Sequence, residues 1–121
     1  MTRESTYTLW LRGCALLSER HFHQAAIVLE QARDLEPTKA SIRESLARAY
    51  YSSGRPDDAR AEFEATLEID PSNDYAHFGL ALSLERIGQL ASARGHAKLA
   101  VAMRPQDENY RRALERIDRA S

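Results

Sequence analysis

The sequence predicts an all-α fold, an α-solenoid of seven helices arranged as antiparallel pairs within one domain over residues 1–121. Hydrophobic residues make up 43% of the chain and charged residues 29%, which is typical of a folded globular protein. A repeat of 34 residues is visible in residue types at fixed positions, and such periods indicate stacked helical units. The recurring residues include Pro37, Pro71 and Pro105, and also Ala25, Ala59 and Ala93.

Small residues recur where the two helices of a pair would cross. Gly13, Ala47 and Ala81 are separated by the same step of 34 positions. Glycine or alanine at a crossing lets the two backbones approach closely, while a larger apolar residue beside it fills the remaining space. The spacing therefore predicts helix packing rather than a catalytic motif.

The first period, residues 6–39, departs most from the other two. Arg20 stands where the later periods have Gly54 and Gly88, and Leu16 stands where the second period has the aromatic Tyr50. We expect a helix pair here, with the register of its first helix left open by these departures.

The second period, residues 40–73, shows both helices clearly. Its first helix is predicted from Ile42 to Tyr51, because apolar residues fall on one face at steps of four, three and one. The segment 52–56 contains Gly54 and Pro56, which favour a helix end and a new helix start. The second helix is predicted from Asp57 to Ile69.

The third period, residues 74–107, repeats this arrangement, and a capping helix follows over about 107–120. In that last helix Tyr110, Ala113, Leu114 and Ile117 form one apolar stripe. A helix that is apolar on one side can close the exposed end of a stack. Its arginines alternate with acidic residues, so we interpret them as a solvated face.

These residues resemble the tetratricopeptide repeat (TPR) family over about residues 6–105, with Arg12 departing from the family's preferred leucine. The resemblance implies a right-handed superhelix whose first helices line a concave groove that binds other proteins. In the second period it is carried by Leu46, Ala47, Tyr50, Gly54, Ala59, Phe63 and Pro71. In the third it is carried by Leu80, Ala81, Leu84, Gly88, Ala93, Ala100 and Pro105.

By this resemblance, the candidate partner-binding residues lie on the first helices. Five of the nine aromatic residues fall in this set, and aromatic side chains are enriched at the centres of protein interfaces. We expect them to bind an apolar peptide or helix, with Arg48 pairing a carboxylate or carbonyl group. The predicted set is Tyr7, Trp10, Cys14, Leu17, Arg48, Tyr51, Tyr75, Phe78 and Leu82.

Members of the family that clamp the C-terminal carboxylate of chaperones carry lysine, asparagine or arginine at five groove positions. The residues at those positions in this chain differ at each one. They are Trp10, Cys14, Ser45, Tyr75 and Gly79. The resemblance therefore favours an adaptor, co-chaperone or assembly factor that binds an apolar segment over one that clamps a chaperone tail.

Two alternatives use the same aromatic surface. Trp10 and Phe78 could pack against neighbouring helices, or residues 1–6 could fold over the groove and fill it. The surface could also join two copies of the chain in a structural homodimer, and the exposed end of the stack offers a second place for such self-association.

Other functions lack a signature in the sequence. The net charge of −1 gives no general attraction to nucleic acid or to an anionic membrane. His21 and His23 have no third ligand nearby, and Cys14 has no orienting partner for nucleophilic catalysis. We therefore expect no enzyme activity, no metal and no cofactor.

The sequence also favours a cytoplasmic location. Cys14 is the only cysteine, so an intrachain disulfide is impossible and a reducing compartment suits the chain. The N-terminus is polar where a signal peptide would be apolar, and no run of residues approaches the length of a membrane span.

Overall fold

The computed structural model describes residues 4–121 and contains seven helices in that part of the chain. Each of the first six forms an antiparallel pair with its neighbour, which confirms the predicted α-solenoid. None of the described helices combines the length and the apolar character that crossing a membrane requires. The helices are α1 (Thr6–Ser18), α2 (Phe22–Leu35), α3 (Ala40–Ser52), α4 (Pro56–Ile69), α5 (Asp74–Ile87), α6 (Leu90–Met103) and α7 (Glu108–Ala120).

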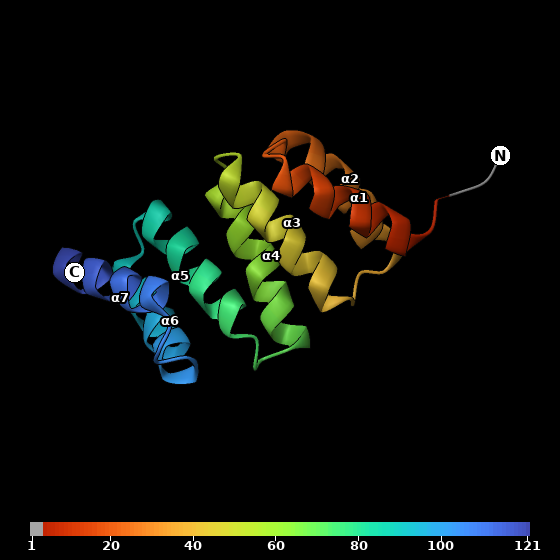
Figure 1. Ribbon diagram of the computed structural model, residues 1–121. Coiled ribbons are helices and arrows are strands. Elements are labelled where there is room, and N and C mark those ends of the chain that lie inside the picture. Colours follow the sequence, from red (N-terminus) through yellow and green to blue (C-terminus); the bar gives the residue numbers. More distant parts are fainter. Residues whose placement is uncertain (1–3) are drawn as a thin grey trace.

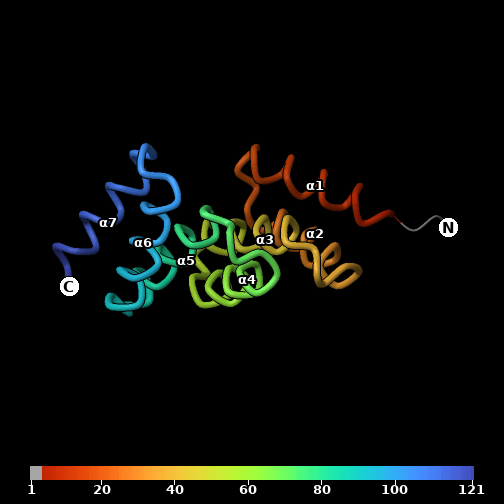
Figure 2. Tube along the Cα trace, turned by 90° about the horizontal axis from the view of Figure 1, so that it is seen from below, coloured from red at the N-terminus to blue at the C-terminus, as the bar shows by residue number. Residues whose placement is uncertain are grey.

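The helices form an elongated row in which each one packs mainly against the next along the chain. Figures 1 and 2 both place α1 and α7 at opposite ends of the row, with α3, α4 and α5 between them. Contacts also join α1 to α3, α3 to α5 and α5 to α7. These four helices therefore form one continuous face of the stack, which we call the groove face.

The small residues of the repeat lie at the helix crossings, as predicted. Gly13 is buried, and Ala47 and Ala81 have no exposed surface. A Cβ atom at Gly13 would lie 2.5 Å from two side-chain carbon atoms of Leu29, so only glycine allows the observed approach of α1 to α2.

The first period departs from the residue pattern of the other two because of its position, although α1 is a continuous α-helix over Thr6–Ser18. Arg12 corresponds by the 34-residue step to Leu46 and Leu80, which are buried against the preceding helix pair. No described helix pair precedes α1, and Arg12 is exposed there and forms an ion pair with Glu4. A charged side chain is tolerated at this position because it remains hydrated.

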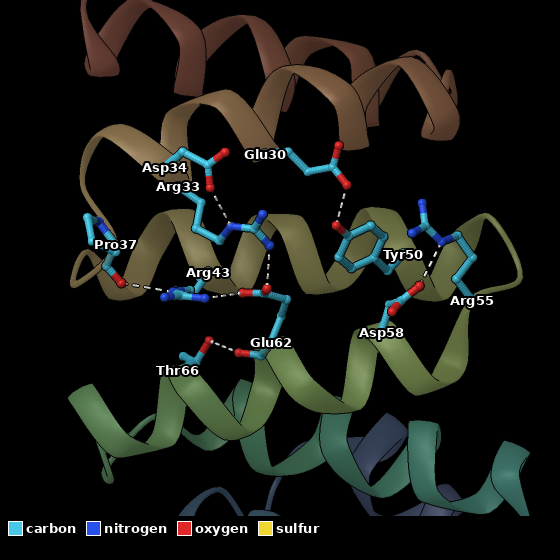
Figure 3. A network of polar contacts seen from close by, with 10 residues as sticks. All are labelled: Glu30, Arg33, Asp34, Pro37, Arg43, Tyr50, Arg55, Asp58, Glu62 and Thr66. Atoms are coloured by element: carbon cyan, nitrogen blue, oxygen red, sulfur yellow. Dashed lines mark hydrogen bonds and ion pairs between the residues drawn. The ribbon is translucent and has the colours of Figure 1, made fainter.

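A buried polar network joins the first pair to the second. The carboxylate of Glu62 on α4 accepts hydrogen bonds from Arg33 of α2 at 2.7 Å and from Arg43 of α3 at 3.0 Å. Figure 3 shows this junction and, beside it, the hydroxyl of Tyr50 donating to Glu30. Burial and this hydrogen bond raise the pKa of Tyr50 to about 12. These contacts tie α2, the second helix of the first pair, to both helices of the second pair.

Candidate binding face

The nine predicted binding residues come from α1, α3 and α5, and the structure gives them different degrees of exposure. Tyr7 and Arg48 are exposed. Six residues are half-buried, and Leu17 is buried. The half-buried residues are Trp10, Cys14, Tyr51, Tyr75, Phe78 and Leu82.

Trp10 is held across the contact between α1 and α3. Its indole Nε1–H donates to the Ser45 hydroxyl at 3.2 Å, and that hydroxyl donates to the carbonyl oxygen of Ser41 at 2.9 Å. The Cys14 sulfur lies 3.8 Å from the same hydroxyl. Trp10 therefore contributes to packing and presents only part of its ring to the solvent, which agrees in part with the packing alternative.

Tyr7 lies beside Trp10 with a ring-centroid distance of 6.2 Å and is 66% exposed. The two rings border a cavity of about 220 Å³ that also includes Lys39 and Ile42. This part of the face could hold one small side chain, because its volume is well below that of typical ligand pockets.

Leu17 does not contribute to the surface. It is buried in the hydrophobic core with Ala25 and Leu29, because the last turn of α1 packs directly onto α2. The sequence position matches a groove position of the family, but the side chain is only 8% exposed and offers a partner little area.

Three rings follow one another along α5 and α7. The centroids of Tyr75 and Phe78 are 6.0 Å apart, and those of Phe78 and Tyr110 are 4.7 Å apart. The Tyr110 hydroxyl donates to Asp74 at 2.7 Å, and burial together with this hydrogen bond raises the pKa of Tyr110 above its usual range. This row of rings fixes α7 against α5.

A cavity of about 770 Å³ lies on the groove face between α3, α5 and α7. Apolar side chains and arginines line it together, and we call it the basic pocket. Arg116 donates two hydrogen bonds to Glu85, at 2.7 and 2.6 Å, and the Arg86 guanidinium lies 5.1 Å from the Tyr51 ring centroid. The lining residues are Tyr51, Phe78, Leu82, Glu85, Arg86, Asn109, Arg112, Ala113 and Arg116.

A second cavity of about 500 Å³ lies at the opposite end of α5, and carboxylates dominate it. We call it the acidic pocket. Burial raises the pKa of Glu44, although a hydrogen bond from Asn73 and the charge of Arg48 act against this shift. The acidic pocket contains Glu44, Asp70, Asp74 and Asp107, with Arg104 as its basic residue.

Sequence reasoning missed three arginines of the basic pocket, Arg86 of α5 and Arg112 and Arg116 of α7. The alternation of basic and acidic residues in the last helix predicts a solvated face instead. Arg112 and Arg116 are four residues apart and flank Ala113, so they project on the same side of α7. That spacing was the available signal, but it could not show that this side of α7 faces α5.

Residues 4–6 do not cover the groove face. Glu4 pairs with Arg12 on the opposite side of α1, and the Ser5 hydroxyl accepts a hydrogen bond from the Thr8 amide at the start of the helix. The remainder of the segment that could fill the groove, residues 1–3, lies outside the described residues.

The histidines near the first turn lie away from this face. His21 and His23 are exposed and border a cavity of about 410 Å³ with Phe22 and Ser52. Within residues 4–121 no group of three or more His, Cys, Asp or Glu side chains is placed to hold a metal ion.

Comparison with known proteins identifies what this architecture resembles. The family model described as tetratricopeptide repeat matches residues 11–74 and 44–108. The tetratricopeptide repeat and J domain-containing co-chaperone DNJ1 of Cryptococcus neoformans is 33% identical over 93 residues, which is 77% of this chain. The chain spans only 18% of the length of that relative.

Solved structures share the fold over almost the whole chain. The first TPR of Spaghetti (RPAP3), bound to the HSP90 peptide SRMEEVD, superposes with a TM-score of 0.91 at 15% identity, covering 96% of this chain and 92% of the other. The Yersinia enterocolitica type III secretion chaperone SycD, in complex with a peptide of the translocator YopD, gives a TM-score of 0.83 at 18% identity, covering 93% and 91%. At these identities the likeness shows the fold.

Proposed function

This chain belongs to the tetratricopeptide repeat family, and from that premise we propose that its groove face binds an apolar peptide or helix of a partner protein. The chain would act as an adaptor, co-chaperone or assembly factor. Such binding requires no cofactor, and we propose that it takes place in the cytoplasm, where the free thiol of Cys14 would remain reduced.

The observation that carries this proposal is the basic pocket between α3, α5 and α7. Its volume of about 770 Å³ is within the range of typical ligand-binding pockets. Tyr51, Phe78 and Leu82 are only partly buried there, so a partner side chain can cover apolar surface that is now in water. Aromatic residues in such positions commonly provide much of the binding energy.

The comparisons support a chaperone-related role. One relative is a co-chaperone by name, and two structural neighbours are complexes with an HSP90 peptide and with a peptide of the translocator YopD. The five chaperone-clamp positions differ in this chain, and Trp10 and Ser45 are engaged with each other. We therefore propose an apolar partner segment instead of a clamped chaperone tail.

Affinity purification with mass spectrometry tests the proposal. The test variant is Tyr7→Ala/Tyr51→Ala/Phe78→Ala, which truncates three rings on the groove face. The matched control truncates three exposed apolar side chains elsewhere, Ile27→Ala/Leu99→Ala/Met103→Ala. We expect the test variant to lose specific partners that the wild type and the control both retain.

Circular dichroism must show that both variants remain folded at the assay temperature. Phe78 packs on Tyr110, and its truncation removes part of that contact, so a melting curve accompanies each purification. Identical partner lists from the wild type and a folded test variant would contradict the proposal.

A homo-oligomer remains the second candidate, supported by the exposed face of α1. Leu11 is 45% exposed, while Ser45 and Gly79, one and two periods later, are buried against a preceding pair. A second copy could cover this face. Thr8 and Arg12 make it more polar than its interior counterparts, which weakens the case. Light scattering that shows only monomer at high micromolar concentration would exclude this candidate.

A further inference from the structure

The two pockets at opposite ends of α5 carry opposite charge. The lining of the basic pocket is positively charged, because it contains one carboxylate, Glu85, and three arginines, Arg86, Arg112 and Arg116. The lining of the acidic pocket is negatively charged, because it contains four carboxylates and one basic residue, Arg104. Phe78 and Asn109 line both cavities, so the two lie next to each other along α5 and α7.

The arginines of the basic pocket are not equally available. Arg116 is neutralised by its paired hydrogen bonds to Glu85. Arg112 lies 3.5 Å from Glu108, but both side chains are about 70% exposed, so water screens the attraction between them. Arg86 has no ion pair with residues 4–121 and rests over the ring of Tyr51. Arg86 and Arg112 can therefore accept a further carboxylate.

The floor between these arginines is apolar. Phe78 and Leu82 of α5 are partly buried, and Ala113 of α7 is small enough to leave space above them. A large apolar side chain would cover these groups, and carboxylates beside it would reach the guanidinium groups at the rim. Arginine pairs well with carboxylates at interfaces because its planar group donates two parallel hydrogen bonds.

The acidic pocket restricts the direction of such a segment. Asp70, Asp74 and Asp107 would repel carboxylates placed toward the α4–α5 turn. We propose that the basic pocket binds a partner segment in which a large apolar residue is flanked on one side by acidic residues, with the acidic side over Arg86 and Arg112. This deepens the function proposed above and rests on it.

Labelled peptides of defined sequence test the site directly. The first probe is fluorescein-Gly-Ser-Leu-Phe-Glu-Glu-Glu-amide, whose amide removes the terminal carboxylate, and the second has lysines in place of the three glutamates. Fluorescence anisotropy measures the affinity of each for the wild type. We expect the glutamate probe to bind at least about tenfold more tightly than the lysine probe and to weaken as salt is raised.

Variants of the chain test whether Arg86 and Arg112 bind the carboxylates of the probe. Arg86→Gln/Arg112→Gln should weaken binding of the glutamate probe by about tenfold, whereas Arg86→Lys/Arg112→Lys should retain most of it. Lys98→Gln/Arg119→Gln is the matched control, because it removes two exposed positive charges outside the pocket and should leave the affinity unchanged. Melting curves confirm that each variant is folded.

Nuclear magnetic resonance of the ¹⁵N-labelled chain then shows where the probe lies. We expect amide shifts centred on Arg86, Asn109 and Ala113. No binding of the glutamate probe at about 1 mM, equal binding to the Arg86→Gln/Arg112→Gln variant, tighter binding of the lysine probe, or shifts centred elsewhere would each overturn the proposed ligand class. Self-association that blocks the pocket would also overturn the proposed ligand class. It would be seen as line broadening that increases with the concentration of the chain in the absence of the probe.

The experiments distinguish failure of the proposed acidic ligand class from failure of the proposed binding function. If the groove-face variant loses its cellular partners while the probe fails, the binding function stands and the acidic ligand class falls. If the probe binds as expected while the cellular partners are unaffected by the three alanines, the function proposed for the groove face falls.

Discussion

Gly79 of α5 lies directly against the ring of Phe63 of α4. A Cβ atom at position 79 would be 2.7 Å from Cε2 of that ring and closer still to Cζ and Cε1. Phe63 is 2% exposed and also contacts Tyr75, so its ring has little room to move. The distance between α4 and α5 is therefore set by the absence of a side chain at Gly79.

We expect Gly79→Ala to lower the free energy of unfolding by about 2 kcal/mol, because the added methyl group must displace Phe63 or separate the helices. Gly95→Ala is the control, since a Cβ atom there meets nothing within 4 Å and the position lies inside α6. That change should stabilise by about 0.5 to 1 kcal/mol. Urea denaturation of both variants measures the difference, and equal stabilities would contradict this packing account.

Arg20 provides a second prediction, because it adopts a backbone conformation that favours glycine. Its φ angle is 65°, and the corresponding Gly54 and Gly88 have φ angles of 81° and 93°. In all three turns the next residue donates its amide to a carbonyl near the helix end, such as His21 to Leu16 at 2.8 Å. The turn geometry is therefore shared, and only the first repeat forms it without glycine.

We expect Arg20→Gly to raise the free energy of unfolding by about 0.5 kcal/mol. The gain from relieving the left-handed conformation is reduced by the entropy of glycine and by loss of the contact between Arg20 and the Phe22 ring at 5.7 Å. Gly54→Arg should have the opposite sign. A drop in the melting temperature of Arg20→Gly would show that the arginine contacts outweigh the strain.

The sequence could predict the features that recur in each repeat, namely the helix pairs and their crossings. It could not predict which side chains are exposed or how α7 approaches α5, because these depend on the three-dimensional arrangement. The 34-residue step identified the helix pairs and the small residues at their crossings, because close packing within a pair is local. The family resemblance predicts Leu17 as a groove residue, but its side chain is 8% exposed and belongs to the core, because the last turn of α1 rests on α2. The approach of Arg112 and Arg116 to α5 depends on the curvature of the stack, which periodicity does not encode.

His77 and His96 form a stacked pair with their Nδ1 atoms 3.1 Å apart. The Nε2–H of His77 donates to the carbonyl oxygen of Pro71 at 3.2 Å, so the neutral His77 presents its Nδ1 lone pair to the Nδ1–H of His96. Burial and the neighbouring His77 lower the pKa of His96, and Glu64 of α4 offsets this only in part. Protonation of His96 is therefore less favourable in the folded chain than in the unfolded chain.

Because the folded pKa of His96 lies below its unfolded value, the unfolded chain binds more protons as the pH falls through about 6.5. We expect the free energy of unfolding to decrease between about pH 7 and pH 5, before most carboxylates titrate. His96→Gln should remove much of this decrease. Urea denaturation across this range measures the slope, and an unchanged slope in the variant would refute the role of the pair.

The carboxylate of Glu62 compensates the charges of two arginines at once. This predicts that variants at the three positions differ in how much they lower the free energy of unfolding. Its side chain is 7% exposed, whereas those of Arg33 and Arg43 are 25% and 22% exposed. Removing Arg43 leaves the pair between Arg33 and Glu62 intact. Removing the charge of Glu62 leaves two partly buried cations close together with no carboxylate between them (Figure 3).

We therefore expect Glu62→Gln to lower the free energy of unfolding by about 2 kcal/mol and Arg43→Gln by about 1 kcal/mol, since partial exposure reduces the full cost of an uncompensated buried charge. Glu68→Gln, an exposed position on the same helix, should change it by less than about 0.5 kcal/mol. Denaturant titrations of the three variants test this order. A cost for Arg43→Gln equal to that of Glu62→Gln would mean that the junction of α2, α3 and α4 relies on packing by the arginine side chains and not on the shared carboxylate.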